Sequence, residues 1–281
     1  MKRKSKKKIG NILITLALLS LGIIVLLPFV FMVVASFTPV RDIFAGGLSL
    51  RLNFETATFD NFRALWTNRN GIYWRFFANS VFVTVVNTVL VLIFTSMVGY
   101  GLGQYQFKGR NFLFMLLLCT MMVPGTILLL PIFRMLSAFN LMDTYWGLIL
   151  PAMVPAFAIF FFRQYCVGLS KDYAEAARID GCGELRIFLN IYVPLMKPAF
   201  GAMGILTGMG VWNDFIWPMI VLRTTESFTL APGIMTSITP HENSFDIVFA
   251  GSLMSVLPII ILFLFNQKTF IGGLTAGGVK G

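Results

Sequence analysis

The chain has 281 residues, of which 57% are hydrophobic and 12% are charged, and its mean hydropathy is +0.81. This composition excludes an ordinary soluble globular domain and indicates an integral membrane protein in contact with a lipid bilayer. The formal net charge of +10 fits membrane topology and anionic lipid better than nucleic-acid binding, because no basic groove with interleaved aromatic residues is evident.

The first predicted element is a basic cytoplasmic tail over residues 1–8, followed by an apolar run over residues 9–35. This run is far longer than the core of a signal peptide, which has about 7 to 15 residues, and no small-residue cleavage site cleanly follows it. The sequence therefore predicts a retained first transmembrane helix. Residues 36–75 are expected to form an extracytoplasmic loop.

Five further apolar runs follow, and each supplies the roughly 20 residues that cross about 30 Å of hydrocarbon as a helix. Only the fourth of these runs contains a charged residue, Asp214. The runs cover residues 76–107, 111–133, 144–162, 198–222 and 247–267. The predicted fold class is an all-α integral membrane protein with six transmembrane helices, five of them in a core over residues 76–268.

Orientation follows from the basic residues near the helix ends, which are enriched in cytoplasmic segments. Most of the 22 basic residues lie in the tail 1–8, beside Lys108 and Arg110, in the segment 167–197, or at the C-terminal end. Both termini, including a C-terminal tail over 269–281, and the segment 167–197 are therefore predicted to face the cytoplasm. The loop over 223–246 is predicted to lie outside, together with residues 36–75.

The segment 167–197, hereafter the island, is a charged stretch between two apolar spans. Glu175, Ala176 and Ala177 are strong helix formers, and Asp172 precedes them where the helix dipole favours an anion. Residues 180–183 then break the helix, because glycine tolerates the left-handed conformation that ends helices.

A second short helix is predicted over residues 184–192, because Pro194 and Pro198 limit its continuation. The island is therefore expected to be a helix, a turn and a helix outside the bilayer. An ordinary amphipathic hairpin at the membrane interface is the alternative interpretation.

The island also fits a spaced pattern at six positions: Glu175, Ala176, Ala177, Gly181, Ile191 and Pro194. Val193 stands where that pattern usually has Leu. The spacing resembles the cytoplasmic EAA loop of ABC importer permease subunits. Further stretches, at 79–80, 99–110, 122–125, 143–151, 212–218 and 274–281, are similar to the MalG-like permease subunits of binding-protein-dependent carbohydrate importers.

The resemblance covers about residues 12–281 and implies an ABC type I importer permease fold in a bacterial or archaeal cytoplasmic membrane. It implies that the island docks in a cleft of an ATPase subunit. Glu175 would pair with a basic residue there, Ala176 and Ala177 would pack closely, and Gly181 would make the turn. Asp180 and Pro194 complete the expected coupling residues. Residues 275–281 either dock on the ATPase or form a disordered tail.

The implied partners are a second, MalF-like permease subunit, two copies of an ABC ATPase and an extracytoplasmic sugar-binding protein. The outer loops would face that binding protein, or they are plain connectors. The chain has no Walker A glycine loop, so ATP and Mg²⁺ are expected on the ATPase subunits, and no cofactor is expected on this chain.

Asp214 is flanked by Asn213, Trp212 and Trp217. An ionisable group at membrane depth is by default a functional candidate. In one interpretation Asn213 and Asp214 line the sugar pathway while the two indole rings stack on sugar faces. In the other, Asp214 lies near the outer interface and the tryptophans are interface or gate residues, since most sugar contacts in related transporters belong to the partner permease.

Catalytic constellations are absent from the sequence. His241 is the single histidine, and Cys119, Cys166 and Cys182 have neither metal-ligand nor disulfide spacing. An enzyme is therefore not expected. A secondary transporter is disfavoured because no internal repeat is evident, whereas an ABC permease for another solute, including a homodimeric one, stays open.

Overall fold

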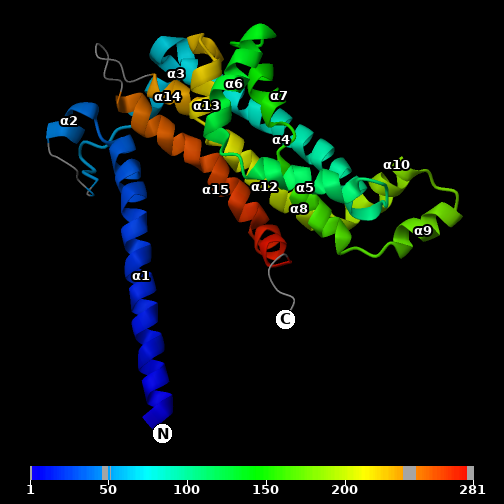
Figure 1. Cartoon of the computed structure of the whole chain (residues 1–281). Helices are drawn as coiled ribbons and strands as arrows, with labels where there is room; N and C mark the ends of the chain where they lie inside the picture. The colour runs from blue at the N-terminus through cyan, green and yellow to red at the C-terminus, as the bar shows by residue number, and fades with distance from the viewer. Residues whose placement is uncertain (1, 46–49, 51, 237–244, 277–281) are drawn as a thin grey trace. The chain divides into compact units, whose positions relative to one another are not determined.

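The computed structural model describes residues 2–45, 50, 52–236 and 245–276, and this part of the chain contains helices and connecting turns (Figure 1). His241 and residues 277–281, with the end of the expected C-terminal tail, lie outside the described residues. The chain divides into two compact units. Unit 1 comprises Met1–Trp74 and Ile234–Leu257, and unit 2 comprises Arg75–Gly233 and Pro258–Gly281.

Unit 1 is built around one long helix and two short ones. Its elements are α1 (Lys2–Phe37), α2 (Val40–Ala45), α3 (Asp60–Thr67), a 3₁₀ turn (Asn68–Gly71) and the first part of α15 (Phe245–Ala276). The buried side chain of Asn61 donates to the backbone oxygens of Ser36 at 3.0 Å and Thr38 at 2.8 Å. This amide therefore ties α3 to the end of α1.

Unit 2 holds most of the helices. They are α4 (Ile72–Gln104, whose first three residues belong to unit 1), α5 (Arg110–Met121), α6 (Gly125–Ala138), α7 (Tyr145–Ala152), α8 (Ala156–Val167), α9 (Asp172–Ile179), α10 (Glu184–Ile187), a π-helical turn (Phe188–Tyr192), α11 (Val193–Leu195), α12 (Lys197–Trp212), α13 (Ile216–Val221), a 3₁₀ turn (Thr225–Ser227), α14 (Leu230–Met235, whose last two residues belong to unit 1) and the remainder of α15.

Two helices of the described chain are long and apolar enough to cross a membrane alone, Asn11–Phe37 within α1 and the whole of α4. Three bent pairs meet the same criterion when each pair is taken together: α5 with α6, α7 with α8, and Glu184–Leu195 with α12. A shorter apolar stretch, Val248–Leu262, lies within α15. The described part of the chain is thus all-helical, with two apolar helices of membrane length and three bent apolar pairs.

The spans predicted over 111–133 and 144–162 are not single straight helices. The axes of α5 and α6 differ by 98°, and those of α7 and α8 differ by 43°. Each break ends at a proline, Pro124 or Pro155, with extended backbone. A proline disfavours helical backbone in the residue before it, so an apolar run continues through these positions although the helix does not.

The second island helix, predicted over residues 184–192, continues past Pro194 to Leu195. The backbone passes from α10 through the π turn into α11, and the 78° bend follows at Met196. Within the π turn the N–H of Val193 bonds to the carbonyl of Phe188. Pro194 then lies at the start of α11, where a missing N–H is tolerated.

The core of unit 2 depends on a close approach between α4 and α8. A Cβ atom added to Gly99 would lie 2.6 Å from Cβ of Phe162, and one added to Gly103 would lie 2.8 Å from Cβ of Cys166. Glycine at both positions therefore lets the two helix backbones pack closely, as small residues do in membrane helix pairs.

A hydrogen-bonded turn closes another part of unit 2. Asp143, with φ of +57°, accepts hydrogen bonds from the backbone N–H groups of Arg223 at 2.8 Å and Thr224 at 3.1 Å, and from the Thr224 hydroxyl. Its own N–H donates to the carbonyl of Val221 at 2.9 Å. These bonds fasten the turn before α7 to the chain that leaves α13.

Candidate functional site

The first helix of the island, α9, has one buried and one exposed face. Ala174 and Ala177 are 3% and 6% exposed and belong to the core of unit 2. Glu175 and Ala176 are exposed. The predicted helix around Glu175 is confirmed, and its small residues divide between the two faces: Ala177 packs inside this chain, and Ala176 points outward.

The turn after α9 is a Schellman motif. Gly181 has φ of +78°, its N–H donates to the carbonyl of Arg178 at 3.0 Å, and the N–H of Cys182 donates to that of Ala177 at 2.9 Å. This pair of bonds satisfies carbonyls at the end of a helix and requires a left-handed residue between them. The turn predicted at Gly181 is therefore confirmed.

The second half of the island is anchored by aromatic side chains. Ile187 and Tyr192 are fully buried, and Phe188 is 6% exposed. The ring of Tyr100, on α4, lies 4.6 Å from the ring of Tyr192 and 5.2 Å from that of Phe188, measured between centroids. The island is therefore packed against the end of α4.

An ion pair closes the island across its turn. Nε of Arg178 lies 2.7 Å from Oε1 of Glu184, and Nη2 lies 3.2 Å from Oε2. The hydroxyl of Tyr105, in the residue that follows α4, also donates to Glu184. The Arg178 guanidinium, together with the Tyr105 hydroxyl, lowers the pKa of Glu184, and Glu184 in turn raises the pKa of Arg178. This network links α9, α10 and α4.

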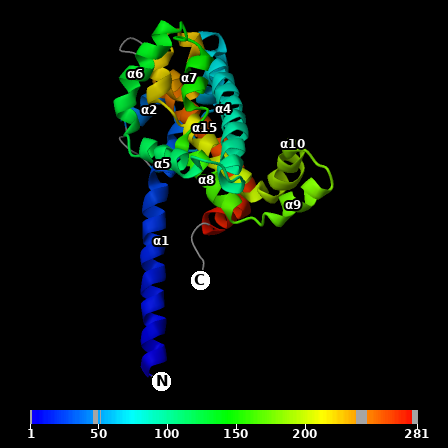
Figure 2. The same ribbon diagram turned by 45° about the vertical axis from the view of Figure 1, so that its right-hand side comes forward.

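The outward surface of the island carries exposed apolar side chains together with charged side chains of both signs. Ile179 is 87% exposed, Leu185 is 62% exposed, and Tyr173 and Leu189 are about half exposed. The expected coupling residues Glu175, Asp180 and Gly181 are exposed, as is Pro194. Figures 1 and 2 both show α9 and α10 at the end of unit 2 away from α6 and α7.

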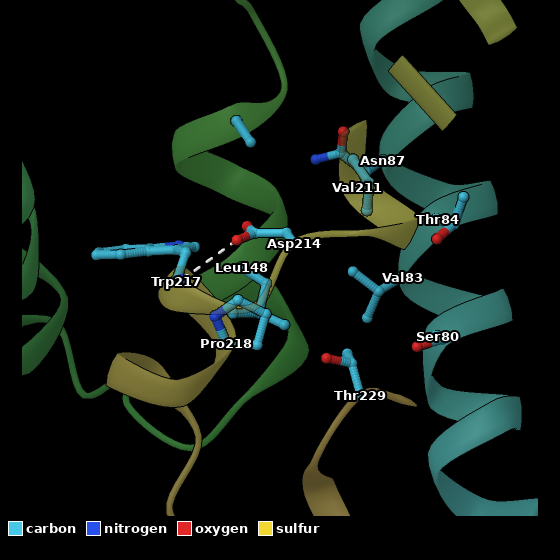
Figure 3. A pocket seen from close by; sticks show the side chains of 11 residues that line it. Ser80, Val83, Thr84, Asn87, Leu148, Val211, Asp214, Trp217, Pro218 and Thr229 are labelled. Carbon is cyan, nitrogen blue, oxygen red and sulfur yellow. Dashed lines mark hydrogen bonds between the residues drawn. The ribbon is translucent and has the colours of Figure 1, made fainter. Parts of the chain in front are cut away.

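The four expected pathway residues do not form one site. Asp214 and Trp217 line a small cavity within unit 2 (Figure 3). Asn213 is exposed and its amide donates to the carbonyl of Met209 at 2.9 Å. Trp212 is buried, with its ring 5.6 Å from that of Phe77 in an edge-to-face contact.

Asp214 lies at a helix break, between the end of α12 and the start of α13, where the apolar run 198–222 is interrupted. Its Oδ1 accepts the backbone N–H of Trp217 at 3.3 Å, a pattern by which acidic side chains stabilise the first turn of a helix. The indole N–H of Trp217 donates to the carbonyl of Gly147 at 3.3 Å.

Polar residues from elsewhere in unit 2 share the cavity with Asp214, and sequence reasoning missed them. They are Ser80, Thr84, Asn87 and Thr229. Asn87 is a polar residue within a charge-free apolar run, which was the available signal. Nothing in the sequence indicates that Thr229 lies beside it.

The described part of the chain is that of a helical membrane protein, and its unit 2 holds a charge-bearing island packed against the end of α4 and a small cavity beside Asp214. The chain belongs to the family of binding-protein-dependent transport system inner membrane components, which it matches over residues 95–269. It is therefore a membrane permease subunit and not an enzyme.

Known relatives match this chain over nearly its whole length. It is 47% identical, over all of both chains, to the arabinooligosaccharides transport system permease protein AraQ of Halalkalibacterium halodurans. It is 46% identical to the Bacillus subtilis protein of the same name, over 96% of each chain.

The fold is similar to that of a chain in a crystal structure of a bacterial ABC transporter involved in the import of the acidic polysaccharide alginate. The TM-score is 0.85 at 25% identity, over 94% of this chain and 97% of that chain.

Proposed function

We propose that this chain forms half of the translocation pathway of an ATP-driven importer of oligosaccharides, and that the island couples it to an ATPase subunit. The family match supports import, and the two relatives named for arabinooligosaccharide transport support a carbohydrate substrate. The observation that carries the coupling role is the two-sided island, which is packed on the core of unit 2 on one side and exposes apolar and charged side chains on the other.

The proposed topology has six transmembrane segments with both termini in the cytoplasm. The segments are α1, α4, the pair α5 and α6, the pair α7 and α8, α12 with α13, and α15. The hydrogen bond from Tyr105 to Glu184 supports this topology, because it holds the basic turn with Lys108 and Arg110 at the same end of unit 2 as the island. Clustered basic residues at one end are typical of a cytoplasmic face.

In the proposed coupling, Glu175 and Asp180 meet basic groups of the ATPase while Ile179 and Leu185 fill an apolar cleft. Motion of the ATPase then reaches α4 through the network of Arg178, Glu184 and Tyr105. The proposed complex includes a second permease, two ATPase copies that bind ATP and Mg²⁺, and an extracytoplasmic sugar-binding protein. Its proposed location is the bacterial or archaeal cytoplasmic membrane.

The test is substrate-stimulated ATPase activity of the chain purified with its copurifying partners, with arabinooligosaccharides as the first substrate. Glu175→Lys reverses a charge on the outward face, and Gly181→Asp puts a side chain at the left-handed turn. Both variants are expected to lose stimulation while the chain still accumulates in the membrane. Glu175→Asp, which keeps the charge at the same exposed position, is expected to keep it.

Stimulation retained by both island variants would remove the coupling role. If a non-carbohydrate solute stimulates the ATPase and oligosaccharides do not, the chain is still part of an importer, but the proposed substrate class is wrong. Copurification of the chain with itself, and with no second permease, would indicate a homodimeric pathway.

A further inference from the structure

The start of α4 is fastened to residues 223–233, which belong to an outer loop in the proposed topology and are hereafter the outer segment. The side-chain nitrogen of Asn79 donates to the backbone carbonyl of Glu226 at 2.8 Å and to that of Phe228 at 2.9 Å. These two carbonyls lie between the 3₁₀ turn and α14, where the backbone is not regularly helical. One amide therefore pairs two backbone groups of a connecting segment.

Two further contacts hold the outer segment on α4. The hydroxyl oxygen of Ser80 accepts the N–H of Leu230, the first residue of α14, at 2.7 Å. A Cβ atom added to Gly233 would lie 2.3 Å from Cδ2 of Phe76, so the Phe76 ring lies directly against the backbone of α14. Phe76, Asn79 and Ser80 are three and four residues apart, a spacing that places them on one face of a helix. Their contacts with the outer segment are hereafter the junction.

The junction is shielded from water. Ser80 and Leu230 are 2% and 1% exposed, and Figure 3 shows Ser80 on α4 opposite the chain that carries Thr229. A buried hydrogen bond is costly to leave unmade, so the segment and α4 stay together in the folded chain. The beginning of the segment is also held, because Asp143 accepts the N–H groups of residues 223 and 224.

α4 connects the junction to the island in one unbroken helix. Of the two helices in the described chain that are long and apolar enough to cross a membrane alone, α4 is the one that lies mainly in unit 2, and the bent pairs of unit 2 each turn by more than 40°. At the other end, the Tyr100 ring packs on that of Tyr192, and Tyr105 donates to Glu184. Every turn of a helix is hydrogen-bonded to the next, so a displacement at the junction reaches the island end.

We propose that Asn79 is a positioning residue that makes the outer segment move with α4, so that docking of the sugar-binding protein on this segment is transmitted through α4 toward the ATPase. The inference rests on the proposed function. Asn79 makes two of the three hydrogen bonds of the junction, because an amide nitrogen has two hydrogens to donate. It acts through the outer segment and not by contact with the sugar.

The test is the ATPase activity of the purified complex in proteoliposomes, without and with its sugar-binding protein loaded with arabinooligosaccharides. Asn79→Asp keeps the size of the side chain and replaces the donating nitrogen by a carboxylate oxygen, which only accepts. The basal activity is expected to stay within about twofold of the wild type, while the stimulation falls about fivefold or more. Asn79→Ala removes the amide without adding a charge and is expected to behave in the same way.

Ala78→Asp is the matched control, because it places the same carboxylate one residue away at an exposed position of α4. It is expected to keep the stimulation. Amide hydrogen exchange of residues 226–230 gives a measurement that does not depend on activity. It is expected to quicken about tenfold in both Asn79 variants and to stay unchanged in the control.

Unchanged stimulation in the Asn79 variants, together with faster exchange of residues 226–230, would overturn the proposal, because the junction would then hold the segment without transmitting its motion. A parallel fall of basal and stimulated activity would also overturn it, because the role of Asn79 would then be structural. The island is tested separately by Glu175→Lys. If that variant keeps the stimulation and Asn79→Asp loses it, the role of Asn79 is supported and the docking of the ATPase on the island is wrong.

Discussion

Arg178 and Glu184 form a two-bonded ion pair across the turn at Gly181, with Nε and Oε1 separated by 2.7 Å. The pair joins the end of α9 to the start of α10. Because Tyr105 donates to the same carboxylate, the turn is also fastened to the end of α4.

Replacing Glu184 with Gln is expected to weaken the island by about 0.5 kcal/mol, since both partners are largely solvent-exposed. Amide hydrogen exchange of residues 180–182 should then quicken roughly twofold. The folded-state pKa of Glu184 is lowered. The ion pair therefore stabilises the island above the ordinary carboxyl pKa of about 4.3, and this stabilisation is lost as the pH falls below that value. A difference in exchange rate between wild type and Glu184→Gln that persists at low pH would contradict this account.

Gly181→Ala is expected to destabilise the island by about 1 to 2 kcal/mol, because φ of +78° is unfavourable for a residue with a Cβ atom. Gly183→Ala is the matched control, since Gly183 has φ of −71° and nothing within 4 Å of an added Cβ. Limited proteolysis of the island should quicken for the first variant only. Equal behaviour of the two variants would show that the left-handed turn is not required.

Gly99→Ala is expected to destabilise unit 2 by about 1 to 3 kcal/mol, because its Cβ would collide with Phe162 and the backbone nitrogen of Arg163. Gly101→Ala places the same methyl group two residues away, with nothing within 4 Å. Thermal unfolding in detergent should separate the two variants. If Gly101→Ala is as destabilised as Gly99→Ala, helix propensity rather than the α4–α8 contact controls the effect.

Asp143→Ala is expected to destabilise the turn before α7 by about 1 to 3 kcal/mol, because the N–H groups of Arg223 and Thr224 lose their acceptor. Asp143→Asn is expected to be milder, since its amide oxygen still accepts and Asn tolerates positive φ. Thermal unfolding of both variants measures the difference.

The pKa of Asp143 sets how the stability of the same turn changes with pH. Burial alone would raise the pKa of Asp143, but the donors on Arg223 and Thr224 together lower it. The Asp143 carboxylate therefore stabilises the turn fully above about pH 4, and this stabilisation is lost as the pH falls through the lowered pKa. The midpoint difference between wild type and Asp143→Asn should shrink in that range, and a difference that grows instead would contradict the assignment.

The sequence predicts well those structural elements that are determined by residues close together in the chain. The helix around Glu175 follows from helix propensity, the turn at Gly181 follows from the conformational freedom of glycine, and the membrane runs follow from hydropathy. Hydropathy is insensitive to backbone direction, however. It joins α5 to α6 across Pro124, although the helix axis turns by 98° there.

The features that the sequence does not predict depend on residues distant in the chain. Tyr105 and Glu184 are 79 residues apart, and only the packing of the island against α4 brings them together. Thr229 and Asn87 line the same cavity for the same kind of reason. Asp214 is half-buried and lines the cavity, but its neighbours along the sequence, Asn213 and Trp212, do not line it.

The attachment of the island to α4 gives that helix the geometry of a lever. Residues 75–104 form an unbroken helical rod about 45 Å long. If the network of Tyr105 and Glu184 tilts the rod by about 5°, its far end moves by about 4 Å over that length. A small rotation at the island would thus displace the other end of α4 by about the width of a carbon chain, without unfolding any turn of the helix.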